Sequence, residues 1–274
     1  PLSSKKLLCV SGLLLALGVG LSAATDGEQI QEPPPTALQL MDSVIAQLPR
    51  EPLIISGEIT MRKRHGVELL GLTFEMALNW GDSPSTARYT IRDASGKDLE
   101  QMIVSRSAGL EASFDYSAGA PLAATNRPGL FDPIRGTDMS WMDLTMSFLW
   151  WRDAAIIKRE EIRGRPCYVV EVKTAGKEPG QYSKALLWID EKMHVLLQAE
   201  GYDVKGKFAR RLWVDSFKKI DERWMVKDLE LQDAAGYHRT KVHISEVKSR
   251  TFSENETGNG AITNHFDYPK SSEI

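Results

Sequence analysis

The sequence has few cysteines, and this excludes a fold held together by disulfide bonds. Only Cys9 and Cys167 occur among 274 residues. We expect Cys9 to be removed with an N-terminal export signal, which leaves the mature chain without an internal disulfide. Cys167 is followed by Tyr-Val-Val, a pattern typical of a buried strand. A catalytic cysteine needs a base and an electropositive setting, and nothing nearby supplies either, so we expect Cys167 to be structural.

Basic charge is not in excess either. The 34 lysines and arginines face 37 acidic residues, which gives a formal net charge of -3. Proteins that bind nucleic acid rely on clustered basic charge to displace counterions. A local basic cluster, Arg62-Lys63-Arg64, stands beside a turn at His65-Gly66, and we interpret it as the solvated end of a hairpin. We therefore expect no nucleic-acid partner.

Catalytic and metal-binding motifs are missing from the sequence. It contains no glycine-rich phosphate loop, no His-Glu-x-x-His helix and no Gly-x-Ser-x-Gly elbow. The five histidines are scattered, and the odd spacing of His238 and His243 on a predicted strand directs their side chains to opposite faces. We expect solvated histidines, no metal, no cofactor and no enzymatic activity. Two acids facing each other across a cleft, as in a glycoside hydrolase, remain an alternative that spacing cannot exclude.

Only one apolar run is long, and it lies near the N-terminus. Leu7 to Leu21 follows Lys5-Lys6 and precedes Ser22-Ala23-Ala24, which is the order of a secretory signal. The run is short for a membrane span of roughly 20 residues, although an uncleaved anchor is the alternative. We expect a periplasmic mature protein. The predicted segments are a signal peptide at 1–24, a linker at 25–35, one folded domain at 36–249 and a flexible polar tail at 250–274.

Most of the remaining sequence has a pattern typical of β-strands. Thr36 caps an amphipathic helical run that ends at Pro49. From Leu53 onward, stretches of about eight to twelve residues are separated by turn signals, and short turns imply antiparallel pairing in one up-and-down meander. The predicted strands are Leu53–Arg62, Val67–Trp80, Ala87–Asp93, Leu99–Ser105, Leu110–Tyr116, Ala154–Ile162, Cys167–Thr174, Tyr182–Asp190, Val195–Asp203, Phe208–Ile220, Trp224–Gln232 and His238–Val247.

The stretch from Thr137 to Trp151 differs from the strand pattern around it, because it has a helical pattern that is rich in aromatic and methionine side chains. It follows a loop at 117–136 that is rich in Gly, Pro and Ala. Ser140 and Asp143 have the spacing of a capping box, with Asp in place of Glu, and Thr137 or Asp138 is equally suited to be the N-cap, so a helix is predicted to begin in this segment. A helix that is apolar nearly all round must be buried on several sides, so a concave surface has to receive it. Either it is a core helix, or it is a mobile lid over a lipid-sized cavity.

Aromatic side chains on the predicted strands are candidates for the same cavity, because tryptophan and methionine form an adaptable apolar surface. Arg210-Arg211 beside Trp213 can turn one guanidinium inward to hold a carbonyl or a helix end, but an outward ion pair is the simpler expectation. The candidate ligand-binding residues are Trp141, Leu144, Met146, Phe148 and Trp151 from the helix, and Trp80, Trp188 and Trp213 from strands; Trp224 also lies on a strand.

Several motifs occur in a familiar order: Gly136–Leu144, Ile162–Val170, Lys184–Asp190, Glu200–Lys207 and Arg223–Val226. From Thr36 to Val247 the chain resembles the bacterial outer-membrane lipoprotein-sorting family, which includes LolA. The resemblance implies a mainly β fold, namely an incomplete, strongly curved antiparallel β-barrel of about 11 strands wrapped around lid or plug helices.

The resemblance also implies a function. A carrier of this family binds acyl chains of lipoproteins or lipids in a hydrophobic cavity, receives them from an inner-membrane donor and hands them to an outer-membrane acceptor, without covalent chemistry. We expect a monomer. The alternative is a periplasmic regulatory module of the same fold that senses lipid or lipoprotein. The family's cavity arginine, which holds the lid shut, has no matching position in this sequence, so the resemblance assigns that role to no residue.

Overall fold

The structure is a computed structural model that describes residues 34–63, 66–109, 111–174, 182–220 and 223–249. The chain divides into two compact units, Pro1–Pro34 and Pro35–Ile274, and the fold below is that of the second. The predicted signal peptide, the linker before residue 34 and the polar tail lie outside the described residues. Within the described residues, no helix combines the length and the apolar character that a membrane crossing requires.

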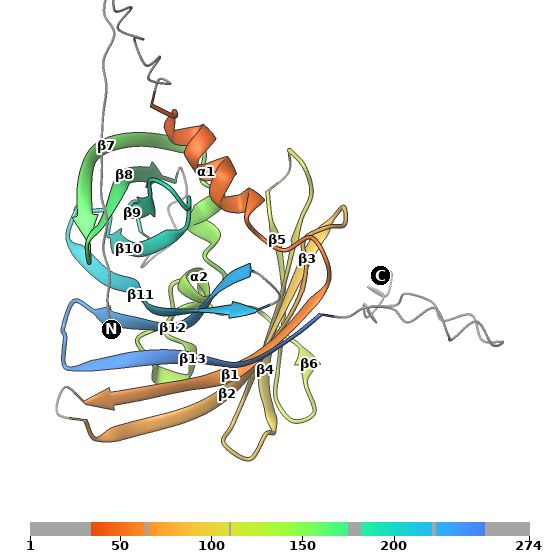
Figure 1. Cartoon of the computed structure of the whole chain (residues 1–274). Coiled ribbons are helices and arrows are strands. Elements are labelled where there is room, and N and C mark those ends of the chain that lie inside the picture. Colours follow the sequence, from red (N-terminus) through yellow and green to blue (C-terminus); the bar gives the residue numbers. More distant parts are fainter. Residues whose placement is uncertain (1–33, 64–65, 110, 175–181, 221–222, 250–274) are drawn as a thin grey trace, which may run out of the picture. The chain divides into compact units, whose positions relative to one another are not determined.

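The fold is mainly β, with one curved antiparallel sheet that does not close (Figure 1). This confirms the predicted incomplete barrel, although the described residues form 13 strands rather than about 11. The strands are β1 (Leu53–Lys63), β2 (Glu68–Asn79), β3 (Ser85–Arg92), β4 (Asp98–Arg106), β5 (Ser113–Ala118), β6 (Ala123–Ala124), β7 (Asp153–Ile162), β8 (Arg165–Lys173), β9 (Lys184–Asp190), β10 (Leu196–Tyr202), β11 (Phe208–Ile220), β12 (Arg223–Asp233) and β13 (His238–Ser249). The short β6 has no strand pattern of its own and exists through its pairing with β5.

The order of strands corrects the prediction of a single meander. Sequential strands do pair as antiparallel hairpins, but β1 lies in the middle of the sheet and pairs with β13 as well as β2. From β1 the chain runs outward to the edge strand β6, crosses to the opposite edge at β7 and returns to β13. Figure 1 shows blue β13 beside orange β1. Local patterns predict hairpins, whereas this pairing joins strands far apart in the sequence.

The predicted N-terminal helix is confirmed as α1 (Ala37–Ala46). Thr36 is its N-cap, and Thr36 and Gln39 form a capping box that satisfies the first backbone N–H groups. The buried face of α1 includes Leu40 and Met41, both fully inaccessible to solvent. These two side chains belong to the main hydrophobic core together with inward-facing residues of the sheet, which is the reason the helix packs there.

The segment that crosses between the two edges contains three short helical pieces rather than one helix through Trp151. They are the 3₁₀ turn η1 (Ile134–Gly136), the α-helical turn α2 (Trp141–Leu144) and the 3₁₀ turn η2 (Ser147–Trp150). The predicted capping box of Ser140 and Asp143 is confirmed at the start of α2. We call residues 137–151 the plug.

The helix ends after one turn because local hydrogen bonds compete with it. The hydroxyl of Thr145 donates to the carbonyl of Trp141 at 2.8 Å and lies 2.7 Å from the hydroxyl of Ser147. Side chains of this type offer the backbone an alternative to further helix. Met146 then adopts a left-handed backbone conformation, with φ of 47°. The plug therefore presents its apolar side chains in two directions rather than along one helical face.

Candidate ligand-binding cavity

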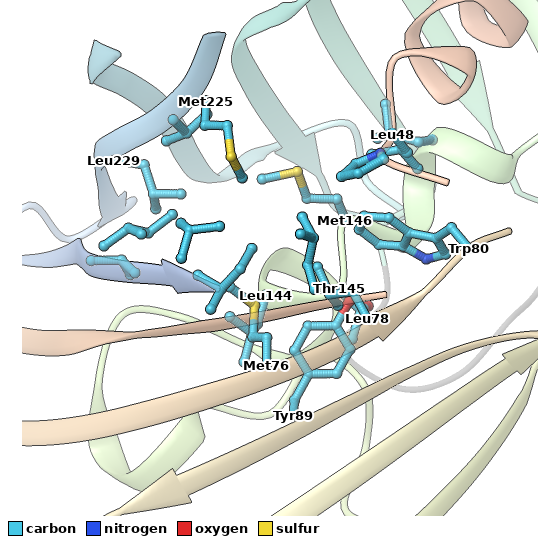
Figure 2. Close-up of a pocket in the computed structure, with 18 of the residues that line it drawn as sticks. Leu48, Met76, Leu78, Trp80, Tyr89, Leu144, Thr145, Met146, Met225 and Leu229 are labelled. Carbon is cyan, nitrogen blue, oxygen red and sulfur yellow. The ribbon is translucent and has the colours of Figure 1, made fainter. Parts of the chain in front are cut away.

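An apolar cavity of about 320 Å³ lies between the concave face of the sheet and the plug. Its volume is at the lower end of the range typical of small-ligand sites. Figure 2 shows side chains of the sheet and the plug pointing into it. The wall comprises Gln47, Leu48, Pro49 and Glu51 after α1, the strand residues Leu53, Ile55, Met76, Leu78, Tyr89, Leu212, Met225, Val226, Leu229, Val242, Ile244, Val247 and Ser249, Trp80 after β2, and Met139, Asp143, Leu144, Thr145, Met146, Leu149 and Trp150 of the plug.

Three of the predicted ligand-binding residues, Trp80, Leu144 and Met146, line this cavity (Figure 2). Trp141 and Phe148 are almost completely buried and support the plug from the core side without lining the cavity. Trp151 is partly buried and packs against the same core. The structure therefore brings six of the predicted residues together: Trp80, Leu144 and Met146 line the cavity wall, and Trp141, Phe148 and Trp151 pack in or against the core behind it.

Trp188 and Trp213 lie on the opposite face of the sheet. Leu187 and Leu212 point into the main core, and successive residues of a strand point to opposite faces. Trp188 packs in a separate cluster with Cys167, and the indole N–H of Trp188 donates to Glu160 at 2.7 Å. The predicted burial of Cys167 is confirmed. The side chain of Trp224 lies outside the described part. Strand parity was the signal that could have separated these tryptophans in the sequence.

The cavity residues that sequence reasoning missed are aliphatic rather than aromatic. Met76 and Leu78 precede Trp80 at alternate positions, and Leu53 and Ile55 alternate in the same way on β1. Such spacing places them on one face of the sheet. Counting alternate positions from Trp80 would have found them, whereas a search for aromatic residues did not.

One side of the plug is held by a buried ion pair. Arg210 on β11 donates to the Asp143 carboxylate at 2.6 Å and to the Tyr182 hydroxyl at 3.3 Å, and Tyr182 donates to Asp143 at 3.0 Å. Both charged side chains are largely buried, with 12% and 5% exposed. Arg210 therefore faces inward, contrary to the simpler expectation, while Arg211 makes the surface ion pair, with Glu200.

Burial and the Asp143 carboxylate shift the pKa of Arg210 in opposite directions and that of Tyr182 in the same direction. Burial lowers the pKa of Arg210, but the Asp143 carboxylate outweighs it and the net pKa is raised, so the guanidinium stays charged. Burial and the same carboxylate raise the pKa of Tyr182 well above its ordinary value, which keeps its hydroxyl a donor. The ring of Tyr182 lies where a Cβ at Gly201 would be, so the missing side chain of Gly201 makes room for the cluster.

A second set of polar contacts ties the start of the plug to β13. The buried Asp138 lies 2.6 Å from Nδ1 of His238 and accepts from the Thr240 hydroxyl at 3.0 Å. His238 is half-buried rather than solvated, while His243 lies 2.8 Å from Asp228 instead. The two histidines thus contact different carboxylates, as their odd spacing predicts. No group of three or more metal-ligating side chains occurs among the residues that the structure describes.

Arg106, the last residue of β4, contacts the other end of the plug. Its guanidinium carbon lies 4.0 Å from the centre of the Trp150 ring, and one nitrogen donates to the Ser147 hydroxyl at 2.9 Å. Among the described residues, no carboxylate lies within ion-pair distance of Arg106. Burial lowers the pKa of its guanidinium. This arginine therefore differs from Arg210 in lacking a counter-charge within the described part of the chain.

Comparison with known proteins identifies the fold. A family model described as "-like: Uncharacterized protein" matches residues 128–256, and no curated protein matches the sequence. A DUF1329 family protein from Desulfovibrio piger is similar with a TM-score of 0.65 at 16% identity, over 77% of this chain and 90% of its own.

Two further solved structures are similar to this chain. A putative outer membrane lipoprotein-sorting protein domain from Vibrio parahaemolyticus has a TM-score of 0.64 at 15% identity, over 80% of this chain and 94% of its own. A LolA superfamily protein from Nitrosomonas europaea has a TM-score of 0.61 at 15% identity, over 80% and 96%. The open, curved sheet around a plug is therefore the LolA-like fold that the sequence resemblance implied.

Proposed function

We propose that this protein is a periplasmic carrier that binds the acyl chains of lipoproteins or lipids in the cavity beneath the plug. The observation that carries the proposal is the apolar cavity of about 320 Å³ between sheet and plug. At about 30 Å³ for each group, which is the volume of a water molecule in the liquid and close to that of a methylene, it accommodates on the order of ten methylene groups. At about 0.8 kcal/mol per buried methylene, the gross hydrophobic gain is about 8 kcal/mol, enough for useful affinity without covalent chemistry.

The construction of the plug supports binding that is followed by release. The plug consists of single helical turns, and a few polar contacts of Asp143, Asp138 and Ser147 tie it to the sheet. A ligand that breaks these polar contacts moves part of the plug, while Trp141 and Phe148 stay buried in the core. A ligand that binds the displaced arrangement better shifts the equilibrium toward it. A role in lipoprotein sorting, with an inner-membrane donor and an outer-membrane acceptor, is supported by the fold shared with the Vibrio domain.

The test is to identify what the protein carries. The protein, produced with its N-terminal segment, would be purified from a bacterial periplasm, extracted with organic solvent and analysed by mass spectrometry. We expect acylated material at about one molecule per protein.

Two tryptophan variants provide the matched comparison. Leu144→Trp places a large ring in the cavity, so the bound acylated material should be lost. Leu69→Trp, on the exposed part of β2, should retain the bound acylated material. Circular dichroism would check that both variants fold, since overpacking costs about 1–3 kcal/mol. An empty wild-type protein that also fails to bind a fluorescent acyl probe would overturn the proposal.

A further inference from the structure

A small polar hollow adjoins the apolar cavity. It has a volume of about 10 Å³ and is lined by Trp80, Ser85, Ala87, Tyr89, Val104, Arg106, Thr145 and Trp150. Four of these residues, Trp80, Tyr89, Thr145 and Trp150, also line the cavity. The two spaces are therefore neighbours with a common wall, and the hollow has room for about one water molecule.

Arg106 supplies an unbalanced positive charge to this wall. Among the described residues lining either space, it is the only lysine or arginine. Two acids line the cavity: Asp143 is already paired with Arg210, and Glu51 is exposed to solvent. Tyr89 does not neutralise Arg106, because burial raises its pKa to about 12 and keeps the phenol uncharged.

A partly buried guanidinium is costly unless an anion balances it. Stacking on Trp150 recovers part of this cost, since a cation–π contact contributes about 0.5–2 kcal/mol. A guanidinium has five N–H donors, yet the described residues accept only one hydrogen bond from Arg106, at the Ser147 hydroxyl. The guanidinium nitrogens of Arg106 that make no hydrogen bond within the described residues are accessible rather than fully buried. They are therefore within reach of a ligand that carries its own anion.

We propose that the ligand of this cavity is a single-chain amphiphile with an anionic head group, whose carboxylate or phosphate pairs with Arg106 while its acyl chain fills the cavity. The inference rests on the proposed acyl-binding function and narrows its ligand from the acyl chains of lipoproteins or lipids to a free single-chain lipid. The volume holds one chain of about ten methylene groups, which excludes a second chain from the same space. Oxygen atoms of the head group accept two parallel hydrogen bonds from the guanidinium.

The hydroxyls of Ser147 and Thr145 complete the head-group site. They lie 2.7 Å apart on the plug, and Ser147 already accepts from Arg106. The head group is larger than one water molecule, so its entry moves these hydroxyls away from Arg106 and widens the hollow. Binding of the anion and displacement of the plug are thereby linked at η2.

The test compares four ligands of equal chain length. Dodecanoate, dodecyl phosphate, 1-dodecanol and methyl dodecanoate would each displace a fluorescent fatty acid from the wild-type protein. The two anions should bind about ten to a hundred times more tightly than the two neutral compounds, which is the range for hydrogen bonds to charged groups. Whichever anion binds more tightly identifies the head group as carboxylate or phosphate.

Two arginine variants assign the preference to one residue. Arg106→Gln should lose the preference for anions and keep its affinity for 1-dodecanol, whereas Arg211→Gln, at a surface ion pair, should retain both. Equal affinity of the wild type for acid and alcohol, or an undiminished preference in Arg106→Gln, would overturn the inference and leave acyl binding standing. Failure of all four ligands to bind would overturn both proposals. The wild-type comparison does not depend on the folding of any variant.

Discussion

The plug is held at two places by two arginines whose surroundings differ. Arg210 reaches Asp143 and Tyr182 in a largely buried cluster, so its charge is balanced within the chain. Arg106 stacks on Trp150 and donates to Ser147, with no carboxylate beside it in the described part. The difference separates a structural arginine, whose counter-charge is built in, from one that remains available to a ligand.

The largest effect should come from breaking the balanced pair. Arg210→Met leaves Asp143 buried without its counter-charge, and removing one partner of a buried ion pair costs about 3–5 kcal/mol. Urea denaturation would measure the free energy of unfolding. The double variant Asp143→Asn/Arg210→Met should lose less than the sum of the two single variants, because no uncompensated charge remains. Additive losses would show that the two side chains act independently.

Arg106→Gln should have a smaller effect on stability. Its loss removes a cation–π contact and one hydrogen bond, and it also removes an unbalanced charge from a partly buried position. We expect the free energy of unfolding of the ligand-free protein to change by about 1 kcal/mol or less. The same urea titration provides the comparison with Arg210→Met. A loss as large as that of Arg210→Met would erase the distinction between the two arginines.

An effect of similar size, which disappears at low pH, concerns a balanced charge on the sheet itself. Burial raises the pKa of Asp228, but hydrogen bonds from Ser216, His243 and Lys241 outweigh it and lower the pKa below its ordinary value. A carboxylate with a lowered folded-state pKa stabilises the fold above its unfolded pKa of about 3.9, and this contribution is lost as the pH falls further.

Asp228→Asn should therefore lower the free energy of unfolding by about 1 kcal/mol at pH 7, and the difference from wild type should shrink below about pH 4. Urea denaturation at several pH values would measure this. A difference that stays constant down to pH 2 would show that the carboxylate's charge plays no part.

Local features of the fold were predictable because neighbouring residues determine them. The capping boxes at Thr36 and Ser140 require only two side chains three residues apart, and both occur. Hairpins separated by turn residues were recognised for the same reason. The end of α2 at Leu144 was not, because the hydroxyls of Thr145 and Ser147 compete with the helix by geometry that a hydrophobic pattern does not contain.

The candidate site was predicted only in part. Placing Trp80, Leu144 and Met146 near a cavity required no more than an apolar pattern and a concave partner for the plug. Placing Trp188 and Trp213 required the parity of each strand, and a one-residue error moves a side chain to the other face. The inward position of Arg210 required knowledge of Asp143, 67 residues earlier in the chain.

The sequence by itself determined the β-rich composition of the chain, the positions of its turns, a helix start between Thr137 and Ser140 and the need for a concave surface to cover the plug. These properties depend on residues that are close together along the chain. The tertiary structure decided that β1 pairs with β13, that the plug crosses between two open edges, and that only one of its two arginines has a built-in counter-charge. Such outcomes depend on which distant residues meet, and the free energy of packing the whole core selects among them.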